Sequence, residues 1–159
     1  MPKLYLDFAQ SLTRLRSYIE QYNERFKTGA TVDGKPTFDL NKKLRGQHRD
    51  LMQFIIRTYA KELNGQEAGA KALRPFRTNS VALGTAMDCS PRTIRNLTAR
   101  LLDARIILEK HHRGRKRCYD LVINPAVFAC QGFEGDTVPV SYTHLRAHET
   151  SLHLVCRLL

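Results

Sequence analysis

The chain of 159 residues has no apolar run approaching the roughly 20 residues that a membrane-spanning helix needs, so no membrane partner is expected. Its first residues, MPKLYLDFAQ, lack the apolar core of a secretory signal. Cysteine is scarce, and Cys89, Cys118 and Cys130 show no Cys-x-x-Cys spacing, so an oxidising compartment is not indicated. We therefore expect a cytoplasmic protein whose cysteines are small buried hydrophobic residues.

Catalytic motifs are also missing. The sequence contains no Gly-rich phosphate loop, no cluster of metal ligands and no nucleophile motif. A zinc site joining Cys89 or Cys118 to His111 and His112 is the alternative, and it is disfavoured because the ligand spacing of zinc sites is absent. We expect no enzyme activity, metal or cofactor here, and any catalytic domain would lie beyond Pro139.

The end of the sequence differs in kind from the rest. Val140–Thr150 back-translates to a string that resembles the adapter of transposase-based sequencing libraries, and Leu154–Leu159 fits the other end of that adapter. The residues between these two stretches leave room, in the same reading frame, for the variable barcode that such an adapter carries. This resemblance implies that Val140–Leu159 is a non-native tail that is not expected to belong to the fold. The alternative is a natural tail rich in Tyr and His. We expect the natural chain to continue past residues 131–139, the start of a C-terminal region.

Acidic residues are few relative to basic ones. The chain has 26 Lys and Arg against 15 Asp and Glu, a net charge of +11, which becomes +10 without the tail. Between Arg74 and Asn124 lie eleven Lys and Arg and four Asp and Glu, so +7 is concentrated there. This excess favours an acidic partner, either nucleic acid or an anionic membrane.

Residues 1–64 are expected to form a helical region. A helix over Leu4–Lys27 carries an apolar stripe with heptad spacing, and a second helix, begun by Asp39 or Asn41, runs to Leu63. Between them we expect a loop with a tight turn at Asp33-Gly34. The stripe either packs on the chain's own core or forms a homodimer, and consists of Phe8, Leu12, Leu15, Ile19, Tyr22 and Phe26. Residues 65–73 are read as a linker.

A short helix begun by Thr78, Asn79 or Ser80 is expected next, followed by a tight turn over Met87–Ser90. Ser90 can then cap a second helix that has Pro91 at its first position. The apolar residues of this second helix, which should face inward, are Ile94, Leu97 and Leu101. Its remaining residues, which should face outward or flank the apolar ones, are Arg92, Arg95, Asn96, Ala99 and Arg100.

A basic hairpin follows at once. Ile106–His112 and Arg117–Ile123 read as strands around a turn at Arg113–Lys116, and Tyr119, Leu121 and Ile123 alternate onto one face.

Together these features resemble the winged helix-turn-helix family of bacteria and phages. Gly84 takes the family's small position where the two helices cross, Cys89 its apolar turn position, and Ile94 and Leu97 its buried helix positions. One departure is Asp88, where the family usually has glycine, although Asp tolerates the left-handed conformation. The resemblance implies a mainly α fold with a small β-hairpin wing, a winged helix-turn-helix over residues 74–130 preceded by two long helices.

The resemblance and the charge predict a protein that binds double-stranded DNA, as a transcription regulator or as the DNA-binding part of a replication or mobile-element protein. The expected base contacts are Arg92, Arg95 and Asn96, because Arg reads guanine and Asn reads adenine in the major groove. The expected backbone contacts are Ser90, Thr93, Arg100, Lys110, Arg113, Gly114, Arg115, Lys116 and Arg117. Arg100 could instead pair with Asp103. The alternative function is a winged-helix module that binds protein or RNA without reading DNA sequence.

Overall fold

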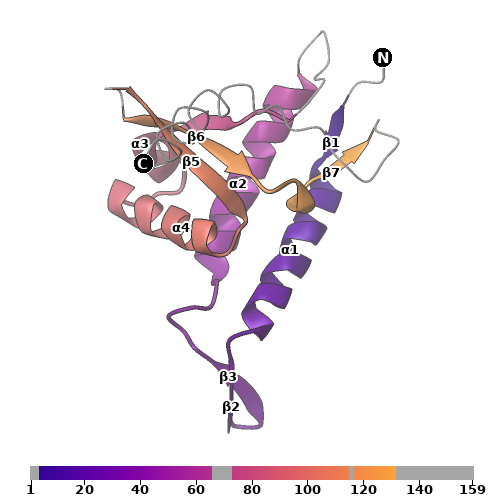
Figure 1. Cartoon of the computed structure of the whole chain (residues 1–159), viewed down its shortest axis with the longest axis vertical. Coiled ribbons are helices and arrows are strands. Elements are labelled where there is room, and N and C mark those ends of the chain that lie inside the picture. Colours follow the sequence, from indigo (N-terminus) through magenta and orange to yellow (C-terminus); the bar gives the residue numbers. More distant parts are fainter. Residues whose placement is uncertain (1–3, 66–72, 115–116, 132–159) are drawn as a thin grey trace, which may run out of the picture.

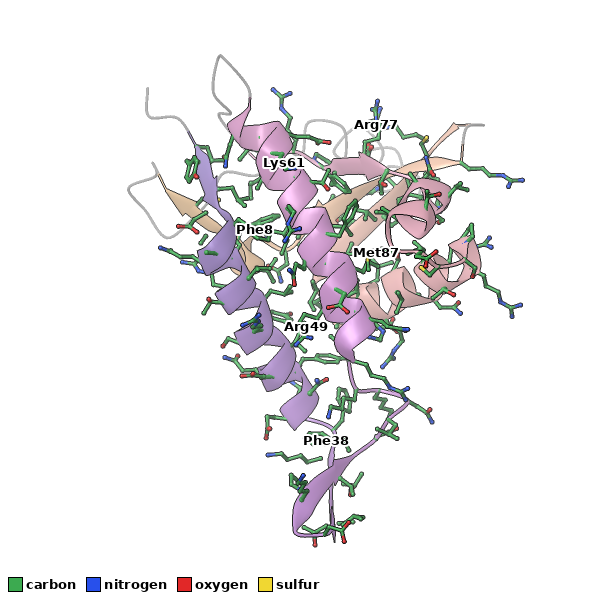
Figure 2. The ribbon with its side chains drawn as sticks, turned by 180° about the vertical axis from the view of Figure 1, so that it is seen from behind. Phe8, Phe38, Arg49, Lys61, Arg77 and Met87 are labelled. Atoms are coloured by element: carbon green, nitrogen blue, oxygen red, sulfur yellow. The ribbon has the colours of Figure 1, made fainter. Side chains whose placement is uncertain are left out.

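The structure, a computed structural model, describes residues 4–65, 73–114 and 117–131. Within them, two long helices, α1 (Phe8–Glu24) and α2 (Gly46–Asn64), pack against each other. Two shorter ones, α3 (Ser80–Ala86) and α4 (Pro91–Asp103), follow, and α4 packs on α2. Figures 1 and 2 place α1 and α4 on opposite sides of α2.

The first described residues are paired with the last. β1 (Tyr5–Asp7) runs antiparallel to β7 (Ala129–Gln131), with Leu6 opposite Cys130. The helix expected from Leu4 therefore begins at Phe8, where the Asp7 carboxylate accepts a hydrogen bond from the Gln10 amide at 2.9 Å. This cap satisfies one of the amides that a helix start leaves without a partner.

The apolar stripe of α1 lies against the core of its own chain. Leu15 and Ile19 are buried, and Phe8 and Tyr22 are half-buried against the same cluster. At the far end of the helix, the Asn23 side chain accepts from the Leu44 amide at 2.8 Å and donates to its carbonyl at 3.0 Å, which ties α1 to the segment before α2. The homodimer stays a prediction.

The segment expected as a loop is a hairpin. β2 (Lys27–Val32) and β3 (Lys35–Phe38) pair antiparallel and project beyond the end of α1 (Figure 1). The tight turn at Asp33-Gly34 is confirmed, because both residues have positive φ angles of 51° and 72°. Neither face of this hairpin is buried, so its sequence lacks the apolar alternation that marks a half-buried strand.

α2 begins at Gly46, later than expected, because Asp39 forms a turn: its carbonyl oxygen accepts from the Lys42 and Lys43 amides. The helix start is held by His48, whose Nδ1 accepts a hydrogen bond from the Arg45 amide at 3.0 Å. His48 is buried, and burial is the largest cause that lowers its pKa below the ordinary 6.5, with the Arg100 and Arg45 charges acting in the same direction.

Stability should therefore fall in mild acid. The folded state disfavours protonated His48, so folding is most favourable when this residue is neutral. The contribution of neutral His48 to the free energy of unfolding is complete above pH 6.5 and is lost as the pH falls from there toward the lower pKa of the folded state. His48→Gln keeps a side-chain acceptor at the third helical position and removes the titration. Urea unfolding at neutral and mildly acidic pH should show a smaller loss for His48→Gln than for the wild type. Equal losses would show that His48 does not carry this dependence.

A three-stranded sheet connects the segment before α3 with the hairpin after α4. β4 (Phe76–Thr78) precedes α3, and the hairpin of β5 (Ile107–Arg113) and β6 (Cys118–Ile123) follows α4. The strand order is β4-β6-β5, all antiparallel, so β6 is central. The expected strands around the basic turn are confirmed.

The buried apolar residues form one cluster that spans α1, α2, α4 and the sheet. The chain leaves β6 through a short 3-10 turn, η2 (Pro125–Val127), and places Phe128 against α2, where its ring stacks on Tyr59 with centroids 5.3 Å apart. The Tyr59 hydroxyl in turn bonds the backbone of Arg74 on the way into β4.

The expectation of a mainly α fold is wrong. The described residues are about 51% helix and 28% strand, with four helices and three small antiparallel sheets, which is an α+β arrangement. β1, β4 and β7 have three residues each, too few to show alternation in sequence. They are stabilised by partners far along the chain.

Candidate nucleic-acid interface

The turn between α3 and α4 has the local features expected from its residues. Asn79 caps α3 by accepting from the Ala82 amide at 2.7 Å. Gly84 is buried where the chain doubles back, and a Cβ atom there would lie 2.6 Å from the Cys89 carbonyl oxygen. Asp88 has φ 51°, the left-handed conformation that Asp tolerates. The close crossing of the two helices thus leaves no room for a side chain at position 84.

The start of α4 is confirmed as expected. Ser90 is the N-cap, its Oγ accepting from the Thr93 amide at 3.1 Å, and Pro91 occupies the first helical position. Ile94, Leu97 and Leu101 are buried against the core. The amphipathic pattern of the sequence thus orients the helix, with one face inward and the other toward solvent.

The outward face of α4 carries the three expected base contacts. Arg92, Arg95 and Asn96 are all exposed, as is Ala99. Their spacing of three, four and seven residues places them on one face of the helix. Asp103 lies at the far end of this helix, where its carboxylate is 3.7 Å from Arg100 Nη1. We call Arg92, Arg95, Asn96 and Ala99 the α4 face.

Arg100 differs from its neighbours. Its side chain is only 29% exposed, it pairs with Asp103, and its charge contributes to lowering the pKa of His48 on α2. Of the two roles expected for Arg100, phosphate contact or ion pair, the structure shows the ion pair.

Lys110 adds a cation on β5, the strand that packs against α4. Its ammonium lies over the Tyr119 ring, 4.1 Å from the centroid. Burial lowers the pKa of Lys110, and the positive charge of Arg95 on α4, the helix that packs against β5, lowers it further.

The other expected backbone contacts lie at the helix start and the hairpin end. Ser90 is exposed and Thr93 half-exposed at the start of α4, while Arg113, Gly114 and Arg117 are exposed at the end of the β5–β6 hairpin. Gly114 and Arg117 both have left-handed backbone conformations, with φ angles of 53° and 54°. Arg115 and Lys116, also expected as contacts, lie outside the described residues, as do Val140–Leu159 and most of the expected linker.

Two charged residues near the hairpin end were not among the expected site residues. Asp120 is 5% exposed, and its carboxylate contacts Arg113 Nε at 2.5 Å and Arg77 Nε at 3.3 Å. The one sequence signal was an acidic residue among the apolar residues of an expected strand. Arg77 could not be found, because its position follows from the pairing of β4 with β6.

No protein-family model, curated protein or solved structure matches the chain. Over the described residues, no three His, Cys, Asp or Glu side chains are grouped so as to hold a metal ion. In the same part of the chain, no helix is both long and apolar enough to cross a membrane. The candidate site therefore rests on the geometry and charge of α4 and the β5–β6 hairpin.

Proposed function

We propose that this chain binds double-stranded DNA in the cytoplasm through a winged helix-turn-helix. Its two helices would be α3 and α4, its wing the β5–β6 hairpin, and α2, which packs on α4, would belong to the same unit. Such a unit suits a transcription regulator or the DNA-binding part of a replication or mobile-element protein.

One observation carries the proposal: the α4 face exposes two arginines and an asparagine in one stripe. A helix fits the major groove, where Arg donates two hydrogen bonds to guanine and Asn pairs with adenine. Ser90 and Thr93, at the positive end of the helix dipole, suit a phosphate. The basic residues of the hairpin would neutralise phosphates of the same duplex.

The test compares a residue of the α4 face with one of the hairpin. Arg95→Ala should cost roughly 1–3 kcal/mol on a selected duplex and less on mixed-sequence DNA, because a base contact discriminates between sequences. Arg117→Ala should weaken all duplexes alike and reduce the salt slope by about one. The measurement is a competition titration on both duplexes at two salt concentrations.

Three outcomes are informative. Different behaviour of the two variants supports base reading by α4. Equal losses on every sequence would leave DNA binding intact but remove base reading. If the wild type binds neither duplex, the DNA proposal fails, and a module that binds protein or RNA becomes the better account.

A further inference from the structure

The buried Asp120 holds two arginines from different strands. Arg77 comes from β4 and Arg113 from β5, on either side of the central strand β6 that carries the carboxylate. Arg77 Nε is 3.3 Å from Oδ1, and Arg113 Nε is 2.5 Å from Oδ2, so each oxygen has its own guanidinium. Figure 2 shows the Arg77 side chain pointing outward from β4.

This cluster lies on the face of the sheet opposite Tyr119. Adjacent residues of a strand point to opposite faces, and the Tyr119 hydroxyl contacts Ser80 at the start of α3, so Asp120 faces away from α3. Among the described residues, Glu109, His111 and the Cys118 thiol also belong to this outer face, and the Glu109 carboxylate contacts His111 Nε2 at 2.7 Å. The Glu109 carboxylate is therefore already engaged by His111.

The arrangement leaves both arginines with donors to spare. A guanidinium has five N–H groups, and the contacts with Asp120 use Nε, which leaves the terminal nitrogens for another acceptor. The Arg77 side chain is 65% exposed and that of Arg113 40%, so solvent reaches both. Two cations against one buried anion leave a net charge of +1, suited to a phosphate, whose oxygens match the planar guanidinium fork.

We propose that Arg77 and Arg113 form a phosphodiester-binding site for the backbone of duplex DNA, and that Asp120 is the positioning residue that orients both guanidinium groups. This inference rests on the proposed function, and it adds Arg77 to the surface that contacts the duplex. Asp120 acts only through the arginines, because it is nearly fully buried.

Asp120→Asn separates positioning from charge. The substitution removes a negative charge beside a polyanion, so electrostatics alone predicts tighter binding. Loss of the oriented arginines predicts the opposite, a weakening of about threefold to tenfold on every duplex, the size of one lost ordinary hydrogen bond. The probe is a labelled mixed-sequence duplex, titrated with the full chain, and thermal melting checks that the variant is folded.

Arg77→Lys gives an independent result, because Arg77 is exposed and the variant keeps its charge. Its ammonium lacks the fork, so binding should again weaken several-fold, whereas the matched Arg16→Lys on the exposed side of α1 should leave affinity unchanged. If Asp120→Asn does not fold, Arg77→Lys alone decides.

Wild-type affinity in Arg77→Lys, or unchanged or tighter binding by folded Asp120→Asn, would overturn the phosphate site. In that case a selective loss in Arg95→Ala would still support the proposed function. If the wild type binds no duplex, both proposals fail together.

Discussion

Ala99→Glu should weaken duplex binding by about a hundredfold or more, because it places a carboxylate on the α4 face, where DNA phosphates would come close. Ala99 is exposed, and it lies one turn beyond Arg95 and Asn96. Glutamate is a good helix former, so the fold should be retained, with stability within about 0.5 kcal/mol. Fluorescence anisotropy of a labelled duplex measures the loss.

Ala9→Glu is the matched control for that experiment. Ala9 is exposed in the first turn of α1, and α1 and α4 lie on opposite sides of α2 (Figure 1). The same charge change there is screened from DNA on α4, so affinity should change by less than about threefold. Equal losses in both variants would mean that only net charge matters and that α4 does not face the duplex.

Gly84→Ala should destabilise the protein by about 1–3 kcal/mol, the usual cost of forcing an extra carbon into a packed site. The new Cβ would lie 2.6 Å from the Cys89 carbonyl oxygen, which is backbone and cannot rotate away as a side chain would. To relieve the clash, α3 and α4 must move apart. The cost should exceed the roughly 0.5–1 kcal/mol that alanine gains over glycine inside a helix.

Gly46→Ala provides the comparison, and its effect should have the opposite sign. Gly46 is the first residue of α2, and a Cβ there meets nothing within 4 Å. Alanine should stabilise by up to about 1 kcal/mol, because it restricts the unfolded chain. Urea unfolding measures the change in the free energy of unfolding for both variants. If Gly84→Ala leaves the stability unchanged or raises it, the crossing of α3 and α4 does not require glycine.

The α3–α4 unit could be predicted from sequence because its signals are local. Ser90 caps the helix through an amide three residues away, and Pro91 costs nothing at the first position, where no partner is needed. Ile94, Leu97 and Leu101 repeat with the helical period and are buried. The exposed positions of Arg92, Arg95 and Asn96 follow from the same period.

The class of fold could not be predicted in this way. β1 and β7 form a sheet although Leu6 and Cys130 lie at opposite ends of the described chain, and β4 is recognisable only from its pairing with β6. Strands of three residues have no periodicity to read, and their stability comes from partners that the local sequence does not identify.

The sequence by itself thus determined the capped, amphipathic α4, the tight turn at Asp33-Gly34 and the basic hairpin, because each depends on residues a few positions apart. Only the tertiary structure packed β5, which carries Lys110, against α4 and placed Arg77 and Arg113 on Asp120. These groupings depend on strand register and helix packing. A charged side chain acquires such neighbours only when distant segments fold onto one core. Its contacts therefore cannot be predicted from the residues next to it in the sequence.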